Sequence, residues 1–242
     1  MPAPDTWRNV LLVMLSLAAG CVDAAGFLGF DEVFVANMTG NTVLLGIAIG
    51  QADSEAVLHA GTALAGFICG VAVGALAVGR KQESVVWPGR VTAALAIELA
   101  ALAAFAGVWL ANGSILSGGV VFLLISLSAL AMGIQSSAVR RLGVPGVATT
   151  YITGTLTNLT EMAIDWLRTI RKTPVENQDQ PEPEPPSARG LLLPADVWLA
   201  YGAGAVVGGS AKFLWWPMAI LFPAGIVGVV VCMATIRYRQ SG

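Results

Sequence analysis

Two short polar segments interrupt an otherwise apolar chain, and their residue types are those that bind small anions. Residues 37–42 read NMTGNT and residues 152–155 read ITGT. Hydroxyl and amide side chains can cap the free N–H groups at the start of a helix, while glycine lets another backbone or a ligand approach closely. The start of a helix also carries a partial positive charge. Two such helix ends would form a binding place for a polar or anionic solute.

Two carboxylates lie inside apolar segments, where ionisable residues are functional candidates by default. Asp23 is placed near the expected level of the first polar segment, so one interpretation is a proton or cation site beside the solute. The alternative is an Asp that only hydrogen-bonds a neighbouring helix end. Glu98 lies in a long apolar run and is a second coupling candidate, with a purely structural role as its alternative.

The residue types argue against an enzyme. No Ser–His or Ser–Lys set lies within the apolar segments, and the single histidine, His59, argues against a His-ligated metal. Cys21, Cys69 and Cys232 show no metal or redox spacing and are interpreted as small buried hydrophobes. We therefore expect no catalytic residue, no metal ion and no cofactor.

Composition indicates an integral membrane protein. Of 242 residues, 56% are hydrophobic and only 12% are charged, and the mean hydropathy is +0.74. Soluble domains carry about 25% charged residues. A helix crosses a bilayer with roughly 20 apolar residues, which predicts six spans at 9–29, 56–79, 90–111, 115–139, 191–210 and 213–236.

Two further apolar stretches, 33–50 and 147–170, contain the polar segments. If both enter the membrane and return on the same side, twelve of the thirteen Lys and Arg residues face the cytoplasm and only Lys212 faces out. Cytoplasmic loops carry the Lys/Arg excess. The sequence therefore predicts a bacterial cytoplasmic-membrane protein with both termini in the cytoplasm. It has two re-entrant segments, each an extended, strand-like run followed by a half-helix that Thr39 or Asn41 would cap in the first case.

The chain also has the pattern of a duplicated unit. Each half, 1–113 and 114–242, reads as a helix, a broken re-entrant segment and two more helices, and three crossings per unit would invert the second copy. Inverted repeats with discontinuous helices are typical of secondary transporters. Small residues recur at every fourth position in both halves, which favours close packing within the bundle or, alternatively, a homodimer through Gly66, Gly70 and Gly74. The second half also contains residues 173–190, whose Pro/Glu-rich composition predicts a disordered linker.

The motifs Gly20-x-x-Asp23, residues 34–42 and Thr153-Gly154-Thr155 resemble the YoaK family of bacterial integral membrane proteins, known mainly as a domain of unknown function. The resemblance covers almost the whole chain. It implies a multi-spanning protein of the cytoplasmic membrane and no established substrate. The linker at 173–190 looks longer than this family usually has.

Together these observations predict an all-α polytopic membrane protein that acts as a secondary transporter or facilitator of a small polar or anionic solute. A channel or a non-transporting membrane scaffold is the alternative, and an intramembrane enzyme is the weaker one. The expected partners are the lipid bilayer and the solute, with no nucleic acid. The predicted solute-binding residues are Asp23, Asn37, Thr39, Gly40, Asn41, Gln135, Thr153, Gly154 and Thr155, with Asp23 and Glu98 as coupling candidates.

Overall fold

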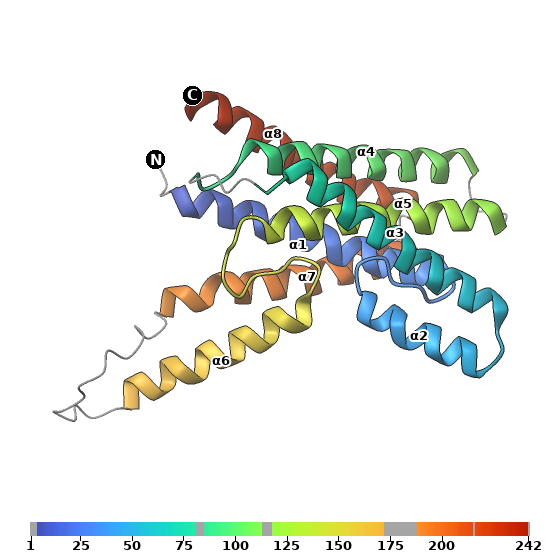
Figure 1. Ribbon diagram of the computed structural model, residues 1–242, viewed down its shortest axis with the longest axis horizontal. Coiled ribbons are helices and arrows are strands. Elements are labelled where there is room, and N and C mark those ends of the chain that lie inside the picture. Colours follow the sequence, from blue (N-terminus) through green and yellow to red (C-terminus); the bar gives the residue numbers. More distant parts are fainter. Residues whose placement is uncertain (1–3, 81–84, 113–117, 172–187, 215, 242) are drawn as a thin grey trace.

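The computed structural model describes residues 4–80, 85–112, 118–171, 188–214 and 216–241 (Figure 1). Within these ranges the chain forms eight helices and no strand. The helices are α1 (Pro4–Gly29), α2 (Met38–Gly50), α3 (Ser54–Val78), α4 (Gly89–Asn112), α5 (Gly118–Arg140), α6 (Ile152–Arg171), α7 (Ala188–Leu214) and α8 (Trp216–Ser241).

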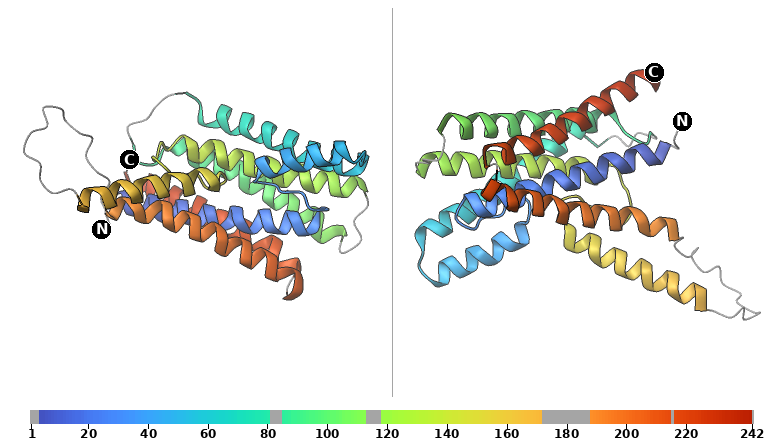
Figure 2. Two further views of the ribbon diagram at one scale, coloured as in Figure 1. Left: turned by 90° about the horizontal axis from the view of Figure 1, so that it is seen from below. Right: turned by 180° about the vertical axis from the view of Figure 1, so that it is seen from behind.

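Six of these helices run along the long axis of the molecule as a bundle, and α2 and α6 lie on one flank of it (Figures 1 and 2). Both flanking helices begin near the middle of the long axis. From there α2 and α6 run toward opposite ends of the bundle. Each is preceded by irregular backbone, residues 30–37 before α2 and residues 141–151 before α6. We call these two irregular stretches the first and second broken segments.

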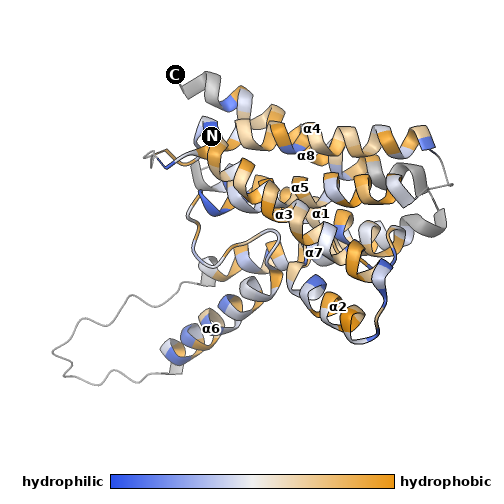
Figure 3. Ribbon diagram, turned by 45° about the vertical axis from the view of Figure 1, so that its right-hand side comes forward, coloured by the Kyte–Doolittle hydropathy of each residue, from blue (hydrophilic) through white to orange (hydrophobic). Residues whose placement is uncertain are grey.

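Apolar length and surface both fit a bilayer. Five helices are long and apolar enough to cross a membrane, which agrees with a multi-spanning protein. Large apolar side chains of these helices are exposed, such as Leu76 at 84% and Val206 at 70%. Coloured by hydropathy, the long helices are mostly apolar along their length (Figure 3). The five spans are Thr6–Gly29, Ser54–Val78, Gly89–Asn112, Gly118–Arg140 and Gly190–Ser210, and the described apolar part of α8 is shorter, Leu221–Arg237.

Three predicted boundaries or elements differ from the structure. The predicted break between the last two spans, between residues 210 and 213, is wrong, because α7 continues to Leu214. The predicted linker ends earlier than 190, because α7 already begins at Ala188; residues 173–187 lie outside the described residues. The strand-like runs are wrong as well, since no strand occurs in the described part of the chain. Side chains, not a neighbouring strand, bind the irregular backbone.

Glycines set the closest helix crossings. A Cβ on Gly204 of α7 would lie 2.0 Å from the carbonyl oxygen of Leu17 on α1, so only glycine fits there. At the crossing of α3 and α5, a Cβ on Gly70 would lie 2.1 Å from the carbonyl oxygen of Leu130. In membranes, where lipid is as apolar as a side chain, such close backbone packing drives helix association.

The predicted ridge of Gly66, Gly70 and Gly74 therefore packs inside the bundle. Cβ atoms on Gly66 and Gly74 would lie 3.1 Å and 2.9 Å from atoms of α5. A homodimer through this ridge stays a proposal, and α5 of the same chain already covers the face that would carry it.

The helix contacts follow a regular pattern. If α1, α2, α3 and α4 are exchanged in order with α5, α6, α7 and α8, the set of contacting pairs is unchanged. The pairs are α1 with α7 and α3 with α5, α1 with α8 and α4 with α5, α2 with α3 and α6 with α7, α3 with α4 and α7 with α8, and the self-paired α1 with α5 and α4 with α8.

Candidate functional site

The first broken segment is held by a buried carboxylate. Asp23 of α1 is 4% exposed, and its Oδ1 accepts hydrogen bonds from the backbone N–H groups of Val35 at 2.8 Å, Ala36 at 2.7 Å and Asn37 at 3.3 Å. Its Oδ2 accepts a hydrogen bond from the hydroxyl of Tyr201 on α7. Irregular backbone at membrane depth must find such internal partners. Asp23 therefore fixes the first broken segment to two helices of the bundle.

Asn37, not Thr39 or Asn41, caps α2. The Asn37 side chain accepts a hydrogen bond from the Gly40 N–H at 3.2 Å, which corrects the predicted cap. The fully buried Asn41 instead binds backbone across the segment: its Oδ1 accepts from the Phe34 N–H at 2.9 Å and its Nδ2 donates to the Phe34 carbonyl at 2.6 Å. Asn41 lies one turn inside the helix, so it can reach back where a cap residue cannot.

The second broken segment uses a hydroxyl and an amide in place of a charge. The Thr155 hydroxyl both accepts from the Ala148 N–H and donates to the Ala148 carbonyl, each at 3.1 Å. The buried Gln135 of α5 donates from Nε2 to the Thr149 hydroxyl at 2.9 Å and to the Leu15 carbonyl at 3.1 Å. Gln135 thus connects this segment to α1.

The second segment has no counterpart, within the described part of the chain, of the three backbone N–H bonds to Asp23 in the first segment. Among the described residues, the N–H groups of Thr149, Thr150 and Tyr151 have no hydrogen-bond acceptor. Ser136 of α5 lies beside them, as both Ser136 and these residues line one cavity of about 230 Å³. These donors are therefore available to an acceptor from outside the chain.

The starts of α2 and α6 line a common cavity of about 380 Å³. Residues from both broken segments and both first helical turns contribute to its wall, together with three side chains from the long helices. The lining consists of Ala36 and Asn37 from the first segment, Met38 and Thr39 from α2, Thr150 and Tyr151 from the second segment, Ile152 and Thr153 from α6, and Phe67, Ser136 and Tyr201 from α3, α5 and α7. We call this space the central cavity.

The structure separates the predicted site residues into two groups. Asn37, Thr39 and Thr153 line the central cavity. Four others are buried behind its wall and bind backbone or a neighbouring side chain; these are Asp23, Asn41, Gln135 and Thr155.

The two predicted glycines allow close approach but need no unusual backbone angle, because both lie in the first turn of a helix and neither has a positive φ. A Cβ on Gly40 would lie 2.9 Å from the Phe34 ring and the Asn37 amide nitrogen. A Cβ on Gly154 would lie 2.2 Å from the Tyr151 ring. Bulk at either position would therefore displace a residue of the cavity wall, Asn37 or Tyr151.

Sequence reasoning did not identify Tyr201, Phe67 or Ser136 as wall residues. Of the three, Tyr201 was the easiest to predict from the sequence, since a tyrosine in the middle of an apolar span needs a partner for its hydroxyl. The other coupling candidate, Glu98, is fully buried in α4, and neither of its carboxylate oxygens is hydrogen-bonded within the described part of the chain. Glu98 does not line the central cavity.

These features define a class of protein: a multi-spanning helical membrane protein in which two helices, each preceded by a broken segment, begin at one cavity. The chain belongs to the family described as "Protein of unknown function (DUF1275)", whose model matches residues 11–233. It is 46% identical over 244 residues to the UPF0700 transmembrane protein YoaK of Bacillus subtilis (strain 168), across 98% of this chain and 97% of that protein. No solved structure matches the chain. The predicted resemblance to the YoaK family is confirmed.

Proposed function

We propose that the chain is a secondary transporter or facilitator of a small polar or anionic solute, and that the solute binds in the central cavity. The observation that carries the proposal is that the first turns of α2 and α6 line the same cavity. Each contributes the partial positive charge of a helix start. A volume of about 380 Å³ falls in the range of small-molecule sites, roughly 300 to 1,000 Å³.

An inverted repeat, with α1–α4 as one unit and α5–α8 as the other, is part of this proposal. It is supported by helix contacts that are unchanged when the two units are exchanged. Matching bonds in the two broken segments support it further. Asn41 bonds both the N–H and the carbonyl of the residue seven positions before it, and Thr155 does the same with Ala148.

The crossing glycines support the same pairing of the two units. Gly204 of α7 lies against the Leu17 carbonyl of α1 as Gly70 of α3 lies against the Leu130 carbonyl of α5. Gly20 and Gly133 are likewise close to Tyr201 and Phe67, the two aromatic residues of the cavity wall. Two equivalent units would place the central cavity on the axis between them.

A re-entrant course for both broken segments completes the proposed topology. The start of α1, the end of α8, the end of α3 and the start of α4 lie at one end of the bundle, and the α2–α3 turn lies at the other (Figure 1). We propose that the end with the termini is cytoplasmic, because twelve of the thirteen Lys and Arg residues would then lie on that side.

The difference between the two segments favours an anionic or acceptor-rich solute. In the first segment three consecutive N–H groups bind the Asp23 carboxylate. In the second, the N–H groups of residues 149–151 have no acceptor among the described residues. A carboxylate or phosphate of the solute, bound there, would make the bonds that Asp23 makes on the other side.

Coupling is proposed to act through Tyr201. Tyr201 lines the central cavity and its hydroxyl donates to Asp23, so one hydrogen bond joins the buried carboxylate to a residue of the cavity wall. Proton or cation binding at Asp23 would change the partner of that hydroxyl. Glu98 is the second candidate, because a buried carboxylate without a partner is costly in a membrane and is kept where it has a function.

The experiment is ligand-dependent thermal stabilisation of the purified protein across a panel of small carboxylates, phosphate, sulfate and neutral polar metabolites. Thr39→Trp and Thr153→Trp fill the cavity from opposite sides, whereas Thr42→Trp and Thr157→Trp place the same bulk on exposed helix positions outside its wall. We expect a stabilising compound to lose its effect in the first pair and keep it in the second. Uptake of that compound into proteoliposomes, with and without a proton gradient, then distinguishes a coupled carrier from a channel.

An equal response of Thr39→Trp, Thr153→Trp and the wild type to the stabilising compound would contradict the proposed site. Binding without any uptake would instead favour a non-transporting protein.

A further inference from the structure

A second, acidic cavity lies where the turn after α1 approaches the start of α3. Its volume is about 660 Å³, and its charged lining residues include Asp31, Glu32, Asp53 and Glu55. No Lys or Arg of the described ranges lines it. Carboxylates gathered without a cation repel one another. Asp53 is already engaged, as it caps α3 by accepting from the N–H groups of Glu55 and Ala56 at 3.1 Å.

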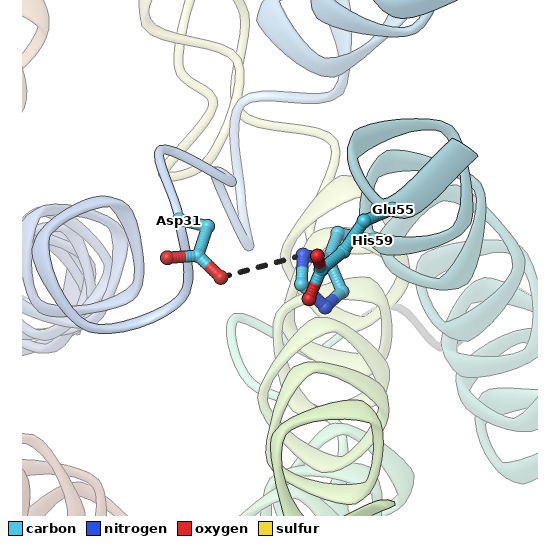
Figure 4. Close-up of side chains that lie close together, drawn as sticks. All are labelled: Asp31, Glu55 and His59. Carbon is cyan, nitrogen blue, oxygen red and sulfur yellow. Dashed lines mark ion pairs between the residues drawn. The ribbon is translucent and has the colours of Figure 1, made fainter. Parts of the chain in front are cut away.

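The only histidine of the chain points into this group. His59 is 2% exposed, and its ring packs against Phe122 of α5 with 4.9 Å between ring centroids. Its Nδ1 makes no hydrogen bond in the described part of the chain and faces Asp31, whose Oδ2 lies 3.6 Å away (Figure 4). A buried nitrogen without a hydrogen bond is rare in native proteins and needs an explanation.

Two elements bring the partners of His59 to it. Glu55 precedes His59 by four residues on α3, so both side chains lie on one face of the helix. Asp31 comes from the turn after α1, where Asp31 and Glu32 have φ values of 50° and 64°. The ligand atoms of Asp31, Glu55 and His59 all lie within 4.8 Å of one another (Figure 4).

We propose that Asp31, Glu55 and His59 bind one divalent first-row transition-metal ion. An imidazole nitrogen with two carboxylates suits Zn²⁺ or a related metal, whereas Mg²⁺ and Ca²⁺ prefer oxygen ligands alone. The charge of the ion balances the two carboxylates. Small movements of the exposed Asp31 and Glu55 side chains would close the site around it.

This site would stabilise the first broken segment and is independent of the proposed transport. Asp31 begins the turn that leads to Val35 and Ala36, whose N–H groups Asp23 binds. A metal ion shared with α3 would therefore hold the segment at its outer end while Asp23 holds it at its inner end. The single histidine of the chain argued against a His-ligated metal ion. The proposed site needs only that one histidine, because its other two ligands are carboxylates from separate elements.

The experiment uses the full chain, purified with a cleavable tag that is then removed, and stripped of metal with EDTA. Calorimetric titration with Zn²⁺ should show one ion per chain, and Co²⁺ should give visible absorption bands of a bound ion. We expect Glu55→Gln and Asp31→Asn to weaken Zn²⁺ binding at least tenfold and to abolish the rise in Tm that Zn²⁺ produces. Asparagine also tolerates the backbone angle of position 31.

Asp165→Asn is the control, because it removes an exposed carboxylate on α6 and should leave Zn²⁺ binding unchanged. Both Asp31 and Glu55 are exposed, so their variants should fold normally, and an unchanged Tm without metal will show this. The absence of saturable Zn²⁺ binding, equal Zn²⁺ binding by Glu55→Gln and the wild type, or equal affinity for Mg²⁺ would each overturn the proposal.

Discussion

The two broken segments are held by different side-chain chemistry. Before α2, a buried carboxylate, Asp23, binds three consecutive backbone N–H groups. Before α6, the neighbouring positions on α5 are Gln135 and Ser136, and the matching N–H groups have no acceptor in the described part of the chain. Each segment is also closed by one side chain that bonds both backbone groups of a residue seven positions earlier, Asn41 in one case and Thr155 in the other.

This comparison assigns different roles to the two halves. In the first segment the N–H groups of residues 34–37 all have acceptors within the chain, so the side chains that accept these bonds should matter chiefly for folding. In the second segment the N–H groups of residues 149–151 have no acceptor among the described residues, so we expect the side chain beside them, Ser136, to matter chiefly for solute binding. Variants at corresponding positions in the two halves test this distinction.

The largest effect is expected at the two glycine crossings, where both halves should behave alike. Gly70→Leu and Gly204→Leu place a side chain where even a Cβ would lie about 2 Å from a carbonyl oxygen, so the helices must separate. We expect no folded protein from either variant, because overpacking of this kind exceeds the usual penalty of about 1–3 kcal/mol. Size-exclusion chromatography of detergent extracts measures this.

Gly61→Leu on α3 and Gly202→Leu on α7 are the matched controls, because a Cβ at either position meets nothing within 4 Å. A folded Gly70→Leu protein beside an unfolded Gly204→Leu protein would show that the two crossings are not equivalent.

The next largest effect should distinguish Asp23 from Ser136. Asp23→Ala leaves three N–H groups and the Tyr201 hydroxyl without their acceptor, and we expect it to destabilise the fold by at least about 3 kcal/mol, because each buried donor left unpaired costs about 1–3 kcal/mol. Ser136→Ala should change stability by less than about 0.5 kcal/mol, while weakening solute binding in the central cavity. Thermal melting and ligand titration of both variants check this. Equal destabilisation by the two substitutions would remove the distinction between the halves.

A smaller effect is expected from the side chains that close each segment. Asn41→Ala and Thr155→Ala each leave one backbone N–H and one carbonyl unpaired, and we expect losses of about 1–3 kcal/mol. Thr42→Ala is the control, since its exposed hydroxyl bonds only the carbonyl of Met38 in its own helix. Melting temperatures rank the three. A Thr42→Ala protein as unstable as Asn41→Ala would show that helix loss, not the closing bonds, explains the effect.

The smallest effect should come from the ion pair on α6. Nη1 of Arg168 lies 3.2 Å from Oδ1 of Asp165, and both side chains are exposed. A spacing of three residues places the two side chains next to each other on one helix face. Such a pair contributes about 0–1 kcal/mol. Asp165→Asn should therefore leave both the melting temperature and solute binding close to those of the wild type. A marked loss of thermal stability or of solute binding would show that α6 does more than present its first turn to the cavity.

Apolar length predicted the membrane class and most of the helices, because lipid imposes a simple rule on span composition. The polar segments also located both helix starts, since α2 begins at Met38 and α6 begins at Ile152. The strand-like runs were wrong because β-branched residues at 33–38 indicate an extended backbone but not its partner. That partner is the side chain of Asp23, which is distant in sequence from the strand pattern.

Tyr201 and the ligands of the proposed metal site could not be predicted for a related reason. Tyr201 meets Asp23 across 178 residues, and only the glycine crossing of α1 and α7 brings them together. Likewise, Asp31 reaches His59 through a turn with left-handed backbone angles that no spacing rule reveals. Local patterns therefore identify the helix starts, whereas the contacts between distant helices come only from the packed bundle.

The most direct test of the central claim, one solute site between two half-helix starts, is uptake of the identified solute by proteoliposomes containing Gly40→Val or Gly154→Val. Each substitution puts bulk against a residue of the cavity wall, Asn37 or Tyr151. Gly46→Val is the control, as a Cβ there meets nothing within 4 Å. We expect at least tenfold slower uptake, per folded protein, in both variants and unchanged uptake in the control. Wild-type uptake by a folded Gly40→Val or Gly154→Val protein would contradict the central claim.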